Sequence, residues 1–249
     1  MRTIFITGAG SGIGAATARL FAAQGWRVGL ADRAGSAVRA LALELGGKAY
    51  PLDVTDRAAM ASALADFTGS EGALDVLFNC AGLLDMSPFA HASHDRLDAI
   101  IDVNVKGVIN GITQALPYLR AGSCVVTMSS AAAIYGVPDL AVYSASKFAV
   151  RGLTEALNVE LDAQGIWVCD VMVGYVDTPM LSKAETTAKS VGMAGINVTP
   201  QMVAQTVLEA VQGRQVHWFV LPDVQEAQAA FDAAPLEERR AMIAGATGY

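Results

Sequence analysis

Short apolar runs alternate with helix-length segments along this chain, and this alternation limits the fold more than any other feature. The runs lie near residues 3–7, 26–32, 48–52, 74–79, 123–128 and 165–172, and a seventh is expected at 216–221. Such runs are typical of buried parallel strands, and right-handed crossovers place the intervening helices on both faces of the sheet. We therefore predict an α/β fold in which residues 1–249 form one domain around a doubly wound parallel β-sheet of about seven strands.

A glycine-rich segment follows the first apolar run. Its sequence, Gly8-Ala-Gly-Ser-Gly-Ile-Gly14, opens an Ala-rich helix that extends to about Gln24. Glycines allow a tight turn and a close backbone approach to a pyrophosphate, which the positive N-terminus of a helix attracts. A glycine-rich turn can also be a plain strand-to-helix connection, and the spacing differs from Gly-x-Gly-x-x-Gly. Its position at the first strand-helix junction favours a Rossmann-type dinucleotide-binding fold.

An acidic residue ends the second apolar run. Asp32 stands 18 positions after Gly14, close to the roughly 20 expected for a carboxylate that binds a ribose. Its oxygens can accept hydrogen bonds from both adenosine ribose hydroxyls, and its charge repels a 2′-phosphate. Arg33 argues the other way, because a guanidinium group suits phosphate recognition. We expect NAD as the cofactor, with NADP as the less favoured alternative.

Tyr143 and Lys147 are separated by one helical turn. The apolar periodicity of residues 140–161 predicts a helix, so the two side chains lie on one face of it. A free phenol has a pKa of about 10, and a neighbouring cation lowers it toward neutrality. Tyr143 is interpreted as the titrating group and Lys147 as the group that tunes it. The same pair can also occur by chance on any helix.

Ser130 ends another buried run, which begins at Cys124. Open parallel sheets bind ligands at the carboxyl ends of their strands, where a hydroxyl can hydrogen-bond a substrate oxygen. Alternatively, Ser129 and Ser130 cap the turn that follows. Together with Tyr143 and Lys147, Ser130 predicts a site that polarises a carbonyl group and exchanges a proton with it.

With these segments in place, the chain up to about Thr178 resembles the short-chain dehydrogenase/reductase family, in its single-domain branch. The resemblance rests on motifs in matching order. These are Thr7 to Gly14, Asp53 in Leu-Asp-Val-Thr, Asn79-Cys-Ala-Gly82, Asn104 in Val-Asn-Val-Lys, and Ser130 at 13 positions before Tyr143 in Tyr-x-x-x-Lys147. Cys80 stands where the family has a second Asn.

The resemblance implies a catalytic tetrad of Asn104, Ser130, Tyr143 and Lys147. In the family, the serine holds the substrate oxygen and the tyrosine is the acid in reduction or the base in oxidation. The lysine lowers the tyrosine pKa and binds the nicotinamide ribose, and the asparagine orders a water that links the lysine to solvent. The implied function is an NAD(H)-dependent alcohol dehydrogenase or carbonyl reductase, which interconverts a secondary alcohol and a ketone by direct hydride transfer.

The resemblance also implies a set of cofactor contacts. They are Gly8, Ser11, Gly12, Ile13, Gly14, Asp32, Arg33, Asp53, Val54, Asn79, Ala81, Gly82, Tyr143, Lys147, Val176 and Thr178. One position departs from the family pattern, because Val173 stands where a proline precedes Gly174. Since proline fixes one backbone angle, we predict a less constrained turn at Val173.

Two other classes of enzyme fit the motifs less well. Enoyl reductases of related fold separate their Tyr and Lys by six residues, whereas three lie between Tyr143 and Lys147. Sugar-nucleotide epimerases are longer and carry a different glycine spacing. A catalytically silent NAD-binding regulatory protein stays open as an alternative, because it would keep the fold and the glycine loop without needing the tetrad.

The last part of the chain departs from the regular alternation. By resemblance, residues 181–198 form a mobile lid over the substrate, and Met180, Leu181 and Met193 either line the pocket or pack within the protein. Tyr135 and Tyr175 leave the same two interpretations open. Residues 224–244 are expected to form a helical tail with a break near Pro235, which caps the pocket, alters a subunit contact or stays loosely held.

Composition limits the partners of the chain. The net charge is -7 with no basic run, which argues against nucleic acid, and no apolar stretch is long enough to span a membrane. Met1 leads almost directly into the first strand, and the three cysteines are an odd number in buried runs. We expect reduced thiols, no signal peptide and a cytoplasmic protein.

Apolar residues make up 53% and charged residues 16% of the chain, respectively above and below the ordinary values of about 45–50% and 25%. This balance predicts helices that are also buried against other subunits. By resemblance, residues 95–119 and 140–161 form the interface of a homodimer or homotetramer. His91 and His94 stand close in sequence without a pattern of further ligands, so we expect no metal site.

Overall fold

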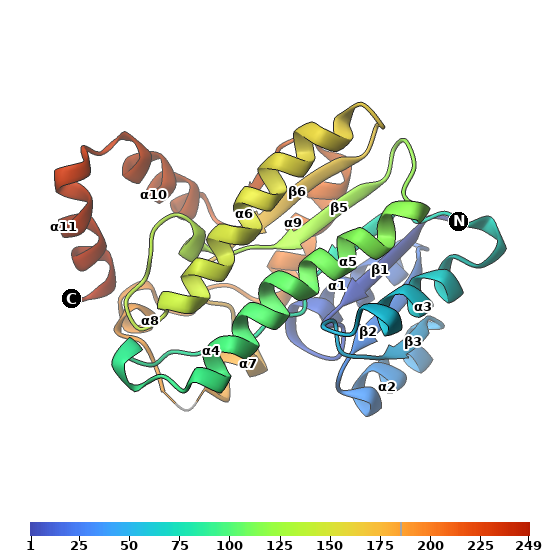
Figure 1. Ribbon diagram of the computed structural model, residues 1–249, viewed down its shortest axis with the longest axis horizontal. Coiled ribbons are helices and arrows are strands. Elements are labelled where there is room, and N and C mark those ends of the chain that lie inside the picture. Colours follow the sequence, from blue (N-terminus) through green and yellow to red (C-terminus); the bar gives the residue numbers. More distant parts are fainter. Residues whose placement is uncertain (185) are drawn as a thin grey trace.

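In the computed structural model, which describes residues 1–184 and 186–249, seven strands form one parallel sheet (Figure 1). Their order is β3-β2-β1-β4-β5-β6-β7. The strands are β1 Thr3–Thr7, β2 Arg27–Asp32, β3 Lys48–Pro51, β4 Val76–Asn79, β5 Cys124–Met128, β6 Trp167–Met172 and β7 His217–Phe219. Each strand falls within one of the predicted apolar runs, and the predicted doubly wound Rossmann-type fold is confirmed.

The helices occupy the segments between the strands and the end of the chain. Their bounds are α1 Gly12–Ala23, α2 Gly35–Leu45, α3 Arg57–Thr68, α4 His94–Ile101, α5 Gly107–Ala115, α6 Ala141–Asp162, α7 Pro179–Ser182, α8 Lys189–Ala194, α9 Pro200–Gln212, α10 Pro222–Ala233 and α11 Leu236–Thr247. Short 3-10 turns occur at Gly69–Glu71, Phe89–His91, Leu116–Tyr118 and Ala131–Ala133.

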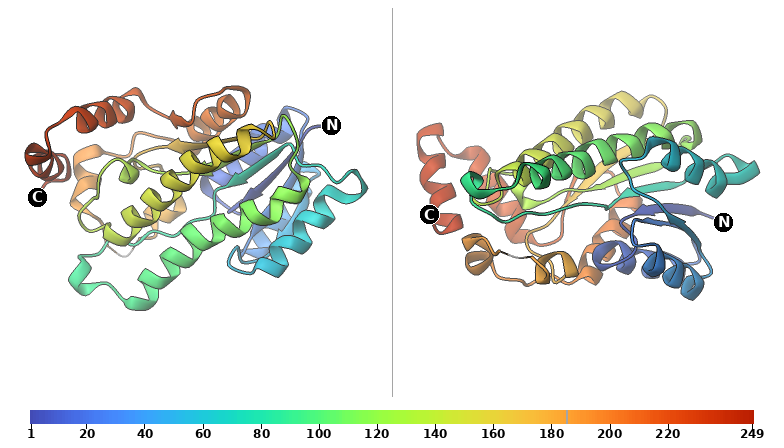
Figure 2. Two further views of the ribbon diagram at one scale, coloured as in Figure 1. Left: turned by 45° about the horizontal axis from the view of Figure 1, so that its top comes forward. Right: turned by 60° about the horizontal axis from the view of Figure 1, so that its bottom comes forward.

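The helices cover both faces of the sheet, as the right panel of Figure 2 shows. Successive residues of a strand point to opposite faces. Ile4 and Ile6 of β1 therefore pack with α1, α2 and α9, whereas Phe5 packs with α3, α5 and α6. Both faces of the central strands are buried, which explains why the runs are apolar without polar alternation.

The order of the strands reverses direction between β1 and β4, because the chain crosses from β3 at one edge to β4 beside β1. In open parallel sheets this switch point leaves a crevice at the carboxyl ends of the strands, where ligands bind. The glycine segment follows β1 at this place, and the segment Asn79 to Gly82 follows β4. Thr7 ties them together, since its hydroxyl accepts hydrogen bonds from the amides of Cys80 and Ala81 at 3.1 and 3.2 Å.

The predicted helix over residues 95–119 is not one regular helix, which corrects the sequence-based expectation. A π-helical turn, Asp102–Lys106, lies between α4 and α5, and a 3-10 turn follows α5. Such turns insert extra residues and commonly occur at functional sites. Asn104 lies within the π turn and is buried.

The two last predicted segments contain helices. Residues 181–198 include the end of α7 and all of α8, whereas Glu185 lies outside the described residues. The tail, defined here as α10 and α11, is helical with a break around Ala234 and Pro235, where proline was expected to interrupt it. Figure 1 shows the tail beside α8, at the end of the molecule opposite the N-terminus.

Candidate active site

The glycine segment is held in a conformation that other residues would not adopt. Gly8 has a φ of +69°, and a Cβ atom there would lie 2.7 Å from Cα of Ala81. A Cβ atom on Gly14 would lie 2.2 Å from the carbonyl oxygen of Gly8. The turn and the start of α1 therefore pack without side chains, which leaves the backbone exposed to a ligand.

Helix α1 begins at Gly12, and its first-turn amides have no partners within the helix. Ser11 is the N-cap residue, but its side chain makes no capping hydrogen bond. The end of α1 thus offers amides and the positive end of the helix dipole to an anion.

Asp32 lies beside the glycine segment at the end of β2. Its two carboxylate oxygens accept hydrogen bonds from the amides of Gly10 at 2.8 Å and Ala34 at 2.7 Å. A cavity of about 140 Å³, here named the Asp32 cavity, is open beside it. Its lining is Gly8, Asp32, Arg33, Leu52, Asp53, Val54, Ala81, Gly82, Leu83 and Val103.

The Asp32 cavity carries charges of both signs. One oxygen of Asp53 accepts hydrogen bonds from the amide and hydroxyl of Thr55, and the other lies 4.0 Å from the Arg33 guanidinium. Burial alone would raise the pKa of Asp53, but the Thr55 hydrogen bonds and the Arg33 charge lower it. Asp53 is therefore an anion that can accept hydrogen bonds at neutral pH.

Asn79 lies behind this cavity and is absent from its described lining. Its side chain is buried, and within the described residues neither polar atom of that side chain has a hydrogen-bond partner. A Cβ atom on Gly111 of α5 would lie 2.3 Å from the Asn79 Oδ1 atom. The structure thus packs Asn79 against α5 and does not bring its side chain to the cleft.

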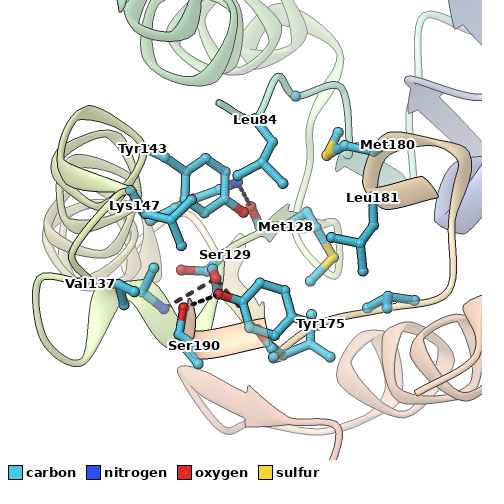
Figure 3. Close-up of a pocket in the computed structure, with 18 of the residues that line it drawn as sticks. Leu84, Met128, Ser129, Val137, Tyr143, Lys147, Tyr175, Met180, Leu181 and Ser190 are labelled. Carbon is cyan, nitrogen blue, oxygen red and sulfur yellow. Dashed lines mark hydrogen bonds between the residues drawn. The ribbon is translucent and has the colours of Figure 1, made fainter. Parts of the chain in front are cut away.

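Ser130, Tyr143 and Lys147 line a second cavity, of about 180 Å³, here named the Tyr143 cavity. Figure 3 shows this cavity with Tyr143 and Lys147 labelled. Ser130 follows β5, whereas the other two residues project from α6. Gly82 and Leu83 line both cavities, so the two are neighbours along one cleft.

Ser130 caps the turn that follows it, which is one of the two interpretations that its sequence position left open; a hydrogen bond to a substrate oxygen stays a prediction. Its hydroxyl accepts a hydrogen bond from the Ala132 amide at 3.1 Å and so caps the following turn. The same hydroxyl lines the Tyr143 cavity and hydrogen-bonds Tyr143.

Burial shifts the pKa values of Tyr143 and Lys147 in opposite directions. Burial raises the pKa of Tyr143 to about 12, and the hydrogen bond from Ser130 opposes this rise. Burial also lowers the pKa of Lys147 to about 8, although Cys80 and Asp170 oppose the decrease. Both shifts disfavour the charged form of a buried group.

The expected lowering of the Tyr143 pKa by Lys147 is not seen in this structure. The Lys147 ammonium lies 5.5 Å from the centre of the Tyr143 ring, and its Nζ atom donates a 2.8 Å hydrogen bond to the Met128 carbonyl. Lys147 thus lies over the face of the ring, and its hydrogen bond to Met128 fixes it to the end of β5. The i, i+4 spacing predicted the proximity correctly but not the direction of the ammonium group.

Asn104 connects the π turn with helix α6. Its amide group exchanges two hydrogen bonds with the backbone of Leu83, at 2.7 and 2.9 Å, and donates a third to the Ser146 hydroxyl at 3.1 Å. Ser146 in turn donates to the Tyr143 carbonyl at 2.6 Å. The Asn104 side chain therefore fixes α6 against the segment after β4, and its expected role in ordering a water stays a prediction.

The segment after β6 forms the wall of the cavity opposite Tyr143. Val173 extends the pairing of β5 and β6, since its carbonyl accepts a 2.9 Å hydrogen bond from the Ala131 amide. Backbone pairing thus holds the residue that replaces the expected proline. Val176 and Thr178 line the same wall, and the Thr178 methyl group faces Gly12 of α1.

Most of the remaining lining is apolar. Met180 and Leu181 face the cavity in Figure 3, whereas Met193 is absent from its described lining and is largely exposed. Tyr135 and Tyr175 line the cavity and also pack, because Tyr135 contacts Phe231 and Tyr175 hydrogen-bonds Ser190 at 2.7 Å. Both sequence-based interpretations of the two tyrosines therefore hold.

The segments that form these two cavities also match the sequence pattern of a known family. The sequence model of the family described as short chain dehydrogenase matches residues 2–189, which include the glycine segment, Ser130 and the Tyr143 helix. The chain belongs to the short chain dehydrogenase family.

Two curated relatives of this short chain dehydrogenase cover most of its length. The 3-oxoacyl-(acyl-carrier-protein) reductase FabG of Thermotoga maritima is 36% identical over 219 residues, which are 83% of this chain and 89% of the relative. Oxidoreductase UcpA of Salmonella typhimurium is 38% identical over 196 residues, which are 76% of this chain and 73% of the relative. Both names describe an oxidoreductase. The name of the Thermotoga maritima relative specifies a substrate, whereas the name of the Salmonella typhimurium relative does not.

Solved structures show the same fold. A 3-ketoacyl-(acyl-carrier-protein) reductase from Brucella melitensis, complexed with NADH, has a TM-score of 0.78 and 26% identity. The similarity covers 88% of this chain and 96% of that chain.

Sequence reasoning missed several residues that shape the site of this short chain dehydrogenase. Ser146 stands three positions after Tyr143, so its place on the same helix face was a usable signal. Cys80, Leu84 and the α11 residues Ala246 and Thr247 also line the Tyr143 cavity. For the α11 residues no sequence signal exists, because only the tertiary fold brings them to the site.

Two classes of site are not found in the described part of the chain. It holds no cluster of three or more His, Cys, Asp or Glu side chains that would ligate a metal ion. Among its helices, none combines the length and the apolar character needed to cross a membrane.

Proposed function

We propose that this protein is a nicotinamide-dependent oxidoreductase that interconverts an uncharged secondary alcohol and its ketone, with NAD(H) preferred over NADP(H). The observation that carries the proposal is the meeting of Ser130, Tyr143 and Lys147 in one buried, mostly apolar cavity. This cavity continues into the Asp32 cavity, so a reacting group and a dinucleotide can share one cleft.

The residues of the cleft fit a dinucleotide. The crowding at Gly8 and Gly14 keeps the loop bare of side chains, as close contact with a pyrophosphate requires, and the uncapped start of α1 offers its amides. Asp32 and Asp53 would hold the adenosine end, and Lys147, Val176 and Thr178 the nicotinamide end. The NADH complex of the Brucella melitensis relative supports this assignment.

A bound nicotinamide would supply the hydride for the carbonyl carbon, or accept it from the alcohol carbon. Ser130 donates a hydrogen bond to the substrate oxygen and polarises the carbonyl. Tyr143 stays protonated at neutral pH because burial raises its pKa to about 12. In reduction its hydroxyl gives its proton to the oxygen that becomes the alcohol, and in oxidation the phenolate takes that proton back.

Lys147 and Asn104 support this reaction. The Lys147 ammonium lies 5.5 Å from the centre of the Tyr143 ring, and it would bind the nicotinamide ribose beside the reacting groups. Asn104 and Ser146 fix the turn of α6 that carries Tyr143. Tyr143 is thereby oriented before substrate binds.

A substrate screen tests the proposal. The oxidation of NADH and NADPH is followed at their absorbance band with cyclic, aromatic, aliphatic and acyl ketones, and the reverse reaction with the matching alcohols. We expect turnover with at least one class of uncharged ketone and a preference for NADH. Tight NADH binding without turnover across the panel would instead support a catalytically silent NAD-binding protein.

A further inference from the structure

We infer that the tail closes the substrate side of the Tyr143 cavity within the same chain and restricts it to compact, uncharged ketones and alcohols that are free of a carrier protein. This inference rests on the proposed function and adds the substrate class to it. The tail lies beyond residue 189, where the family match ends.

Helix α11 supplies part of the cavity wall. Ala246 and Thr247 line the cavity. Thr247 is 1% exposed, and its hydroxyl donates a 2.6 Å hydrogen bond to the Ile243 carbonyl within the helix. Ala246 is exposed at the mouth of the cavity, where a larger side chain would narrow the opening.

Tyr249 fastens the end of α11 to the body of the protein. Its hydroxyl donates a 2.5 Å hydrogen bond to Asp139, in the loop before α6, and the Lys189 ammonium of α8 lies 3.9 Å from the centre of its ring. Among the described residues, Asp139 is the one non-glycine residue with a positive φ, at 64°. That conformation is uncommon for a residue with a side chain, so the Tyr249 contact helps to explain why it is held.

A second fastening holds the tail at its middle. The Phe231 ring of α10 lies 5.3 Å from the Tyr135 ring, centre to centre, and Tyr135 itself lines the cavity. The Arg239 guanidinium covers the same Phe231 ring at 4.9 Å. The tail therefore contacts the cavity wall at two separate places, which distinguishes it from a loosely held extension.

Helix α8 completes this side of the cavity. Ser190 of α8 hydrogen-bonds Tyr175 at 2.7 Å, and Figure 3 shows this pair facing Tyr143 across the cavity. Because Lys189 of the same helix contacts Tyr249, α8 and α11 form one joined wall. Movement of either helix would open the substrate side.

The cavity itself limits what can bind. Lys147 is the one ionic side chain of its described lining, and its ammonium already bonds the Met128 carbonyl. The cavity has a volume of about 180 Å³, and its lining includes Val176 and Thr178, the residues assigned to the nicotinamide end. A bound nicotinamide would therefore occupy part of this volume. A dry cavity of about 150 Å³ holds a benzene molecule, so the space left beside the nicotinamide would take a compact substrate.

These limits separate this chain from its relatives that act on substrates joined to an acyl carrier protein. Such a substrate needs an open path for the linker between the reacting carbonyl and the carrier. Here α8 and α11 meet across the substrate side, and no second charged residue in the described lining would receive a charged linker. A free, compact ketone fits the cavity better than a tethered acyl group.

The test compares a homologous ketone series of increasing bulk in three variants. Ala246→Phe narrows the mouth and is expected to lower kcat/KM of the bulkiest ketones by about tenfold or more while sparing the smallest. Tyr249→Phe removes the hydrogen bond to Asp139 and is expected to raise the ratio of bulky to small ketones by about fivefold, mainly through KM. Arg240→Gln, at an exposed α11 position outside the lining, is the matched control and should leave the ratio unchanged.

A binding assay and a tethered substrate complete the test. Ketone binding to the complex with oxidised NAD, which holds no hydride to transfer, is followed by tryptophan fluorescence and should show the same size dependence. The wild type should not reduce a carrier-bound 3-oxoacyl thioester. Efficient reduction of that thioester, or an unchanged size preference in Ala246→Phe, would overturn the inference while leaving the oxidoreductase intact. If NADH binds but no ketone binds or reacts, the proposed function fails, and the inference fails with it.

Discussion

Tyr143 and Lys147 show how burial sets the chemistry of single residues in this protein. Burial raises the pKa of the phenol to about 12 and lowers that of the ammonium to about 8. The Tyr143 hydroxyl thus stays protonated across the physiological range, whereas Lys147 changes charge at its upper end. The site keeps a buried cation at neutral pH, which costs folding free energy.

Replacing Lys147 should therefore stabilise the protein. Since the unfolded state holds this proton up to a pKa of 10.5 and the folded state only to about 8, the stability of the wild type rises between these pH values. At pH 7 the burial of the Lys147 charge costs about 3 kcal/mol. Replacing Lys147 also removes its hydrogen bond to Met128, which reduces the expected gain in stability by about 1 kcal/mol.

Lys147→Met is expected to gain about 2 kcal/mol in urea unfolding at pH 7, with a smaller gain at pH 10. The same variant should lose turnover, because Lys147 is assigned to hold the nicotinamide end of the cofactor. A variant that is less stable than the wild type at pH 7 would show that the buried ammonium is a net stabilising group.

Asp32 is expected to set the cofactor preference. Its carboxylate is fixed by two backbone amides and lies in the same cavity as Arg33. Asp32→Ser removes the charge that repels a 2′-phosphate and leaves the guanidinium, so the ratio of the Kd for NADPH to the Kd for NADH should fall by about tenfold or more. Fluorescence titration of both cofactors measures this ratio, and an unchanged ratio would remove Asp32 from cofactor selection.

At the scale of elements, a buried polar chain joins β6, β7 and α6. Asp170 of β6 is fully buried and lies 2.8 Å from the His217 ring of β7, whose other nitrogen lies 3.2 Å from Glu155 of α6. Burial alone would lower the pKa of His217, but the hydrogen bond and charge of Asp170 raise it. Burial raises the pKa of Asp170, and His217 opposes that rise.

This pair should make stability depend on pH. Because the folded pKa of His217 is raised, its contribution is complete below the unfolded value of about 6.5 and is lost as the pH rises through the folded value. His217→Gln is expected to lower the free energy of unfolding by about 3 kcal/mol at pH 6 and by less at pH 9. Adding Asp170→Asn should restore part of the loss, since no uncompensated carboxylate remains.

Urea unfolding at the two pH values measures these differences. The exposed pair Arg19 and Glu44 gives the matched control, and Arg19→Gln should change stability little at either pH. An equal loss for His217→Gln at pH 6 and pH 9 would show that the pair does not titrate as described.

The elements were predictable to different degrees. Buried strands carry strong sequence signals, because both faces are apolar and turn residues bound them, so each strand was found within its predicted run. The π turn at Asn104 was not predictable, since one extra residue hardly alters the apolar periodicity of the surrounding helix. Its hydrogen bonds to Leu83 and Ser146 come from segments distant in sequence.

At the scale of the whole molecule, the neighbouring helices α5 and α6 carry large apolar side chains that are partly or largely exposed. On α5, α6 and the turn after α5, the large side chains of Ile109, Leu116, Phe148 and Val159 are exposed, Val159 by 77%. Exposed apolar groups gathered on neighbouring helices are typical of subunit interfaces. We propose that the protein self-associates through this surface.

Charged substitutions on this surface should separate the subunits. The double variant Phe148→Asp and Val159→Lys is expected to have the mass of a monomer in light scattering after size-exclusion chromatography, because the interface would then bury unpaired charges. Leu43→Lys, at an exposed apolar position of α2 in the opposite helix layer, is the control and should leave the mass unchanged. A monomeric wild type, or an associated double variant, would contradict the proposal.

The candidate site was predictable where local sequence builds it. The glycine loop, Asp32 and the Tyr143–Lys147 pair each lie on one element, and the structure brings them to a common cleft. The parts that the sequence did not reveal depend on distant contacts. The direction of the Lys147 ammonium is set by Met128, Asn79 turns toward α5, and the tail reaches the cavity through Tyr249 and Phe231.

The most direct test of the account is the rate of hydride transfer from NADH to an accepted ketone in Tyr143→Phe, measured in a single turnover beside the Kd for NADH. Tyr135→Phe, which also lines the cavity, is the control. We expect the Tyr143 variant to bind NADH like the wild type while hydride transfer falls by about 10³-fold, because the proton donor is missing. Transfer at a rate close to that of the wild type would contradict the account.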